Sequence, residues 1–166
     1  MNKKEVIKRL DHTVLDRETC ESDILRAAAE AAEYGAASVC VPPAYVAAAA
    51  KFAQGKVPIT TVIGFPLGYA SEKVKVYEAK TAVSDGADEI DAVINIGAFK
   101  SGDAAAKNEI LALRRATEGR TLKIIVETCL LSEAEKIDIC RFLSDGAADF
   151  IKTSTGYSTG GAVVSD

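Results

Sequence analysis

Short runs of Val, Ile and Leu alternate along the chain with longer runs that are rich in Ala and carry polar side chains. The short apolar runs predict strands that are covered on both faces, and the longer runs predict helices with one apolar side. This alternation is typical of βα units around a parallel sheet. We predict strands over residues 11–15, 38–41, 59–63, 89–94, 122–127 and 150–153.

Helices are expected between these strands, with one short helix before the first strand. We predict them over residues 3–10, 19–34, 44–53, 71–85, 104–118 and 132–144. Ser132, followed three residues later by Glu135, predicts a capping box at the start of the last helix. Gly35 and Gly86 follow predicted helices at positions where a glycine commonly forms the C-terminal cap.

Composition and charge narrow the class of protein. The chain has 166 residues, of which 48% are hydrophobic and 27% are charged. This balance predicts one globular domain over residues 1–166 and excludes disorder as the main state. The net charge is -4 and no basic tract is present, which excludes the electrostatic footprint of a nucleic-acid-binding protein.

The distribution of apolar residues indicates where in the cell the protein is expected. No run approaches the roughly 20 apolar residues that span a bilayer. The N-terminal residues lack the apolar stretch of a signal peptide. We therefore expect a cytoplasmic protein that binds no membrane.

The cysteines and the histidine make a structural metal site unexpected. The four cysteines form no C-x-x-C pair, and His12 is the only histidine. Neither a zinc site nor a disulfide framework is therefore expected. We interpret His12 as a packed or hydrogen-bonding side chain in the first strand.

Charged side chains fall inside three successive predicted strands, where apolar residues are the rule. They are Asp91, Lys123 and Lys152. Desolvation and a neighbouring cation both lower the pKa of a buried lysine, and the neutral amine can attack a carbonyl to form a Schiff base. A nearby carboxylate can then move protons. If the strands curve into a barrel, these side chains converge at the C-terminal mouth, where such folds place their active sites.

Structural interpretations of the same residues stay open. A strand lysine commonly extends its ammonium group into water, and Asp91 can serve as the counterion of Lys123. Cys40, at the end of the second strand, is more typical of a small buried hydrophobic residue than of a nucleophile.

Polar segments follow the last two predicted strands. Glu127 and Thr128 are expected to hydrogen-bond neighbouring strand ends rather than to catalyse a reaction. The loop over residues 154–161 is rich in Gly, Ser and Thr, so it offers backbone N–H groups that can bind a phosphate.

Six segments, in order along the chain, resemble the deoxyribose-phosphate aldolases, a family of class I aldolases that form a Schiff base on a TIM barrel. The segments are LDHT (10–13), SVCVPP (38–43), VIGFPLG (62–68), GADEID (86–91), KIIVET (123–128) and FIKTSTG (150–156). The resemblance covers essentially the whole chain. It implies an α/β fold of the TIM-type (β/α)8 barrel family, with about six βα units present in this chain.

The resemblance also implies roles for individual residues. Lys152 matches the Schiff-base lysine and Asp91 matches the aspartate of the proton relay. The residues implied in substrate binding are Asp11, Thr13, Cys40, Lys123, Thr155 and Gly156. The implied reaction is the reversible cleavage of 2-deoxy-D-ribose 5-phosphate to D-glyceraldehyde 3-phosphate and acetaldehyde, with no metal or organic cofactor. Such an enzyme acts in deoxyribonucleotide catabolism and carbohydrate degradation.

The chain departs from the family pattern after the sixth strand. The family continues with a seventh strand, in a Val-Lys-Ala-Ser-Gly-Gly-like segment, and with an eighth strand that carries a phosphate loop. We therefore expect a barrel that is incomplete at its C-terminus. Without the lysine of the seventh strand, we expect Lys152 to stay protonated at neutral pH and turnover to be weak. Tyr157 stands where some members carry a cation.

Exposed strand edges in such a chain lead us to expect a homo-oligomer. Two other functions stay open. One is a different Schiff-base barrel aldolase, and the other is a weakly active or non-catalytic interaction protein that keeps the fold.

Overall fold

The strands form where the short apolar runs predict them. The computed structural model describes residues 2–166. The strands of the described chain are β1 (Asp11–Thr13), β2 (Ser38–Val41), β3 (Ile59–Ile63), β4 (Glu89–Val93), β5 (Thr121–Ile125) and β6 (Phe150–Lys152). Each lies within two residues of a predicted range, so the strand prediction is confirmed; β2 and β3 have the predicted bounds, and the other four strands are shorter than expected.

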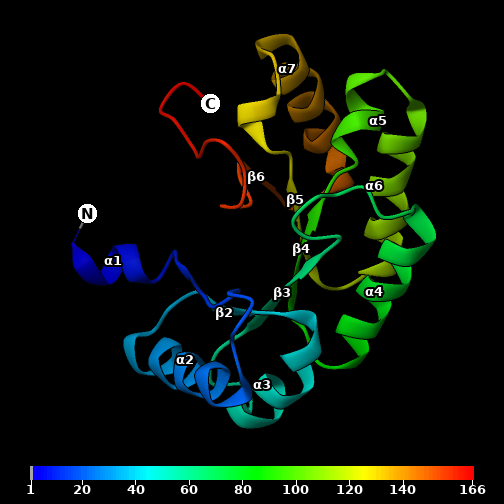
Figure 1. Cartoon of the computed structure of the whole chain (residues 1–166). Helices are drawn as coiled ribbons and strands as arrows, with labels where there is room; N and C mark the ends of the chain where they lie inside the picture. Colours follow the sequence, from blue (N-terminus) through cyan, green and yellow to red (C-terminus); the bar gives the residue numbers. More distant parts are fainter. Residues whose placement is uncertain (1) are drawn as a thin grey trace. The chain divides into compact units, whose positions relative to one another are not determined.

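The helices also follow the predicted order (Figure 1). They are α1 (Lys3–Ile7), α2 (Glu21–Tyr34), α3 (Val46–Ala53), α4 (Glu72–Ser84), α5 (Ile96–Lys100), α6 (Ala104–Ala116) and α7 (Glu133–Phe142). Short 3-10 turns cover η1 (Pro43–Tyr45) and η2 (Thr128–Leu130), and an irregular turn, η3 (Leu143–Ala147), follows α7. None of the described helices is both long and apolar enough to cross a lipid bilayer.

Local sequence signals set the helix ends. The capping box at the start of α7 is confirmed, because Ser132 accepts a hydrogen bond from the Glu135 amide and the Glu135 side chain accepts one from the Ser132 amide. Gly35 caps α2 in the left-handed conformation, with φ of 68°. A residue with a Cβ atom adopts this conformation only at an energetic cost, which explains a glycine at this position.

The chain divides into two compact units. The first contains the described residues up to Val62 together with Thr81–Glu89. Within it, β1 and β2 pair in parallel with Thr13 opposite Cys40, and β2 continues in parallel onto β3. Helices α2 and α3 lie side by side in this unit (Figure 1).

The core of the first unit explains the Ala-rich composition of α2. Its buried residues are Ile24, Ala27, Ala28 and Ala31, which recur at the spacing of one helix face. Small side chains on that face let the helix approach its neighbours closely.

The second unit contains Ile63–Lys80 and Ile90–Asp166. Here β5 and β6 pair in parallel, with Lys123 opposite Phe150 and Ile125 opposite Lys152. The Ile94 amide, directly after β4, donates to the Ile125 carbonyl of β5. The strands of this unit therefore lie in chain order, which brings β4 and β6 to opposite sides of β5.

The expectation that the strands are covered on both faces is wrong for the first and the last strand. The side chains of β2 and β3 are buried throughout, as expected for parallel strands. In β6, Phe150 is 59% exposed and Ile151 is 43% exposed. No residue of β1 is buried either, so only β2 to β5 are covered as the sequence pattern predicts.

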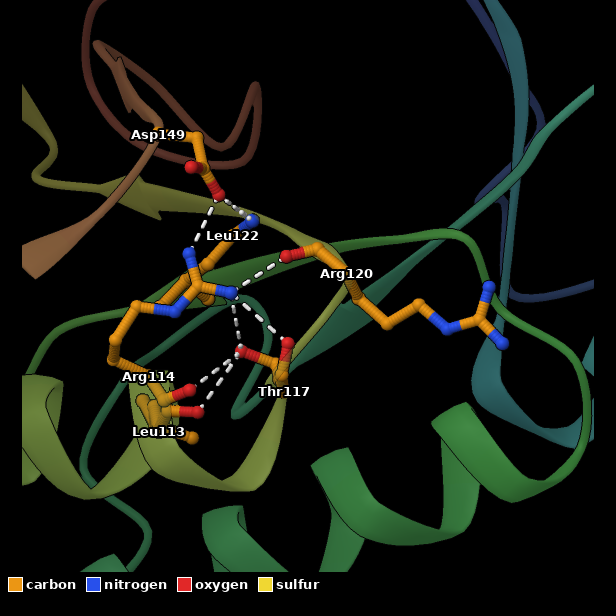
Figure 2. A network of polar contacts seen from close by, with 6 residues as sticks. All are labelled: Leu113, Arg114, Thr117, Arg120, Leu122 and Asp149. Carbon is orange, nitrogen blue, oxygen red and sulfur yellow. Dashed lines mark hydrogen bonds and ion pairs between the residues drawn. The ribbon is translucent and has the colours of Figure 1, made fainter.

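A polar network joins α6 to the amino ends of β5 and β6 (Figure 2). The Arg114 guanidinium donates to Asp149 Oδ2 at 2.6 Å and to the carbonyls of Thr117 and Arg120. Asp149 Oδ2 also accepts from the Leu122 amide at 2.7 Å. We call Arg114, Asp149 and these partners the amino-end network.

The amino-end network changes the acidity of its carboxylate. Burial acts to raise the pKa of Asp149, but the hydrogen bonds from the Leu122 amide and from Arg114 outweigh it and lower the pKa below its ordinary value. The network thus favours an ionised Asp149 in the folded chain.

Candidate active site

Asp91, Lys123 and Lys152 meet within the second unit, as the strand pattern predicts. Asp91 lies in the middle of β4, Lys123 in the middle of β5 and Lys152 at the end of β6. Strand register explains why both lysines share a face. Lys152 pairs with Ile125, which lies two residues after Lys123, and residues two apart point to the same side of a strand.

The carboxylate of Asp91 lies between the two ammonium groups. Lys152 Nζ donates to Asp91 Oδ2 at 2.5 Å, and Lys123 Nζ lies 3.4 Å from Asp91 Oδ1. Asp91 Oδ1 has no hydrogen-bond partner among the described residues. One carboxylate oxygen is therefore bound to Lys152, while the other retains an acceptor position.

The three side chains differ in their exposure to solvent. The Asp91 side chain is fully buried, Lys123 is 10% exposed and Lys152 is 33% exposed. Both amines face a buried carboxylate, so the interpretation of the two lysines as ordinary solvent-directed side chains is wrong. The counterion interpretation of Asp91 agrees with the geometry, but the carboxylate contacts Lys152 more closely than Lys123.

This arrangement supports proton transfer between an amine and a carboxylate. A short contact between Nζ and Oδ2 lets Asp91 take a proton from Lys152 without movement of the backbone. A neutral, partly exposed amine beside a carboxylate is the requirement for nucleophilic attack on a carbonyl.

Polar groups that follow β5 hold the loop that follows β6. The Glu127 carboxylate accepts from the Thr155 amide at 3.2 Å and from Thr155 Oγ1 at 2.5 Å. The Thr128 amide donates to the Thr153 carbonyl. These contacts confirm that Glu127 and Thr128 hydrogen-bond a neighbouring strand end. They also show that the Thr155 hydroxyl is already used inside the protein.

The loop after β6 makes further contacts in the second unit. Thr155 Oγ1 accepts from the Tyr157 amide at 3.0 Å. The Tyr157 ring packs edge-on against Phe65, with ring centres 5.3 Å apart. Gly156, between them in sequence, has φ of 84°, a conformation that favours glycine. The loop is therefore fixed at both Thr155 and Tyr157.

The other expected site residues belong to the first unit. Asp11 Oδ1 accepts from Ser38 Oγ at 2.8 Å, and Thr13 Oγ1 donates to the Asp11 carbonyl at 2.8 Å. Cys40 is completely buried and forms no disulfide, as expected for a small buried hydrophobic residue. His12 Nε2 lies 2.9 Å from Glu30 Oε2, which confirms the expected hydrogen-bonding role.

Sequence reasoning missed one buried ion pair. Lys75 of α4 and Glu109 of α6 pair at 2.8 Å inside the second unit. A signal for it exists, because each charge occupies the buried side of its helix. Lys75 is four residues before the buried Ala79, and Glu109 is four residues before the buried Leu113.

Within residues 2–166, no cluster of three or more His, Cys, Asp and Glu side chains has the arrangement of a metal site.

Comparison with known proteins identifies relatives over nearly the whole chain. The family described as DeoC/LacD family aldolase matches residues 5–165. Deoxyribose-phosphate aldolase from Clostridioides difficile (strain 630) is 46% identical over 98% of this chain and 75% of its own length. The same enzyme from Clostridium botulinum (strain Okra / Type B1) is 49% identical over 96% of this chain and 76% of its own length.

Solved structures agree with the fold. The tetrameric deoxyribose phosphate aldolase from Aeropyrum pernix is similar to this chain with a TM-score of 0.87 and 30% identity, over 94% of this chain and 67% of that one. This similarity confirms the expected α/β fold of the TIM-type barrel family. The chain spans about three quarters of the length of the curated relatives.

Proposed function

Because the chain belongs to the DeoC/LacD family of aldolases, we propose that it cleaves 2-deoxy-D-ribose 5-phosphate reversibly to D-glyceraldehyde 3-phosphate and acetaldehyde. This reaction makes it a carbon–carbon lyase. The observation that carries the proposal is the Asp91 carboxylate, which lies within 3.4 Å of two lysine amines on neighbouring strands.

The first steps use the contact between Lys152 and Asp91. Asp91 Oδ2 takes a proton from Lys152 Nζ, 2.5 Å away, and leaves a neutral amine. The amine attacks the aldehyde carbon, C1, of the open-chain sugar. Asp91 returns its proton to the carbinolamine hydroxyl, which leaves as water, so that the nitrogen becomes a protonated imine and Asp91 is a carboxylate again. This imine withdraws electrons from the neighbouring carbon–carbon bond.

The cleavage step needs a base for the C3 hydroxyl. The Asp91 carboxylate accepts that proton through a bridging water, the C2–C3 bond breaks and D-glyceraldehyde 3-phosphate leaves. Electrons from the bond form an enamine on Lys152. Protonation of the enamine at C2 and hydrolysis of the imine release acetaldehyde and restore the lysine.

Lys123 supports the acid–base role of Asp91. Its ammonium group is nearly buried and lies 3.4 Å from Asp91 Oδ1. A cation at this distance compensates the charge of the buried carboxylate. In this mechanism Lys123 carries no covalent intermediate.

We propose that the remaining residues bind the sugar. Asp11, Thr13 and Cys40 are assigned to the sugar chain by the resemblance of their strands to the family. Gly156 is assigned to the phosphate, because the backbone N–H groups of this glycine and its neighbours can bind a phosphate oxygen. Thr155 contributes chiefly by fixing this loop, because its hydroxyl donates to Glu127.

Reductive trapping tests the assignment of the nucleophile. The protein is incubated with acetaldehyde and sodium borohydride, and the modified lysine is located by peptide mass mapping. Modification of Lys152, and its loss in Lys152→Met, is the expected result. Lys107→Met, which removes a half-buried lysine that pairs with Asp138, serves as the control and should keep the modification. Labelling confined to another lysine would overturn the assignment.

We further propose a homo-oligomer in the cytoplasm. The related Aeropyrum enzyme is tetrameric, which supports self-association. All four cysteines are free, and three of them are exposed, as is common in a reducing compartment. Sedimentation equilibrium of the purified protein tests the oligomer, and a strictly monomeric mass would refute it.

A further inference from the structure

A buried ion pair lies in the second unit, apart from the proposed catalytic residues. Lys75 Nζ of α4 and Glu109 Oε1 of α6 are 2.8 Å apart, and their side chains are 0% and 5% exposed. Burial lowers the pKa of Lys75, and the contact with Glu109 partly offsets this effect. The proposed reaction uses neither group, so the pair needs another explanation.

Both members of the ion pair also hydrogen-bond backbone groups at the end of β4. Lys75 Nζ donates to the carbonyl of Val93 at 2.8 Å, and Glu109 Oε1 accepts from the Asn95 amide at 3.3 Å. Val93 is the last residue of β4, two residues after Asp91, and Asn95 caps α5. The two charges therefore fix the backbone on both sides of Ile94.

The segment that follows β3 leaves room for the Lys75 side chain. A Cβ atom at Gly64 would lie 2.7 Å from Cε of Lys75. The Gly64 amide donates a hydrogen bond to Glu78 Oε2 at 2.8 Å. The segment after β3 thus packs directly against the lysine side chain, which limits the positions that Nζ can adopt.

Stability alone explains the pair poorly. Removal of two charges from water is costly, and well-packed apolar side chains of similar volume often stabilise a protein as much as a buried ion pair. Apolar side chains, however, cannot hydrogen-bond the Val93 carbonyl or the Asn95 amide. The specific contribution of Lys75 and Glu109 is the position of this backbone.

We propose that Lys75 and Glu109 are positioning residues for the aldolase reaction. They fix the carboxyl end of β4 and thereby hold Asp91 at hydrogen-bond distance from Lys152. This inference rests on the proposed function, because it concerns the geometry of the same acid–base pair.

The test compares an apolar pair with a neutral polar pair. Lys75→Met/Glu109→Met keeps most of the volume and removes the hydrogen bonds. Lys75→Gln/Glu109→Gln removes the charges and keeps groups that can donate and accept. For each variant we would measure urea unfolding and the kcat and KM of sugar-phosphate cleavage. Lys107→Met/Asp138→Met, which removes an exposed ion pair between α6 and α7, is the matched control.

We expect the Met/Met variant to fold with close to wild-type stability and to keep the KM of the wild type. Its kcat should fall at least about tenfold, because a small displacement of a catalytic group slows the chemical step strongly. We expect the Gln/Gln variant and the control to stay within about threefold of wild type in kcat. A folded Met/Met variant with wild-type kcat would overturn the proposal.

If the Met/Met variant does not fold, the Gln/Gln variant decides. Retention of kcat supports positioning by hydrogen bonds, and a tenfold loss in a stable Gln/Gln variant refutes it. Failure of the proposed function is recognised separately, because the wild-type protein would then neither cleave the sugar phosphate nor be trapped at Lys152.

Discussion

At the scale of the residue, Asp91 is the group on which the proposed chemistry depends. Its carboxylate is fully buried and contacts amines from two different strands. A buried carboxylate is costly unless cations or hydrogen bonds compensate it, so the two lysines also explain how Asp91 is tolerated in a strand. The same two amines place the carboxylate beside the proposed nucleophile, Lys152.

Asp91→Asn tests this role with little change in shape. The amide cannot act as a base, so we expect kcat to fall by about 10²–10⁴-fold, the usual contribution of general acid–base catalysis. The measurement is steady-state cleavage of 2-deoxyribose 5-phosphate. Asp138→Asn, at an exposed position of α7, is the control and should retain wild-type kcat. Unchanged kcat in Asp91→Asn would exclude Asp91 as the base.

The three charged residues of the candidate site could be found from sequence because charges inside apolar strands are conspicuous. Asp91, Lys123 and Lys152 all break runs of Val and Ile. Their contact distances could not be predicted, because these depend on the register of β5 and β6. Lys75 and Glu109 were missed because a charge in a helix is ordinary until the buried side of the helix is worked out.

At the scale of the element, strand positions followed from the hydrophobic runs, and helix ends followed from caps. Helix α5 was not predicted. The apolar run of β4 continues through Ile94, and Gly97 is a poor helix former. Asn95 nevertheless begins the helix by accepting a hydrogen bond from the Ala98 amide. A single capping side chain thus decided between a longer strand and a new helix.

The amino-end network predicts a stability effect that is independent of catalysis. Arg114→Met removes donors to Asp149 and to two carbonyls that follow α6. We expect the free energy of unfolding to fall by about 1–2 kcal/mol. This loss is small for hydrogen bonds to charged groups, because Asp149 is partly exposed to water.

Urea unfolding of Arg114→Met measures this loss. Arg115→Met, at the exposed position next to it on α6, is the matched control and should unfold like the wild type. Equal stabilities of the Arg114 and Arg115 variants would show that the network contributes nothing.

At the scale of the whole molecule, several carboxylates share one response to acid. Hydrogen bonds from the Ser132 amide and then from Lys100 lower the pKa of Glu135 to about 2. The pKa of Asp149 is also lowered, since hydrogen bonds there outweigh burial. A carboxylate with a lower pKa in the folded chain binds protons more readily in the unfolded chain, so protonation favours unfolding.

We therefore expect constant stability between neutral pH and about pH 5, followed by a progressive loss as the pH falls toward 2. Urea unfolding at a series of pH values measures this profile. Glu135→Gln should be less stable than wild type at neutral pH and should lose less on acidification. Equal wild-type stability at neutral pH and at about pH 2.5 would contradict the expectation.

The close approach of Gly64 to Lys75 has a consequence for sequence variation. A methyl group at residue 64 would overlap the lysine stem, and the left-handed backbone there, with φ of 62°, adds to the penalty. Substitutions at these two positions should therefore be epistatic. Gly64→Ala should be more harmful in the wild-type background than beside a short side chain at residue 75. Among homologues, the two positions are expected to covary.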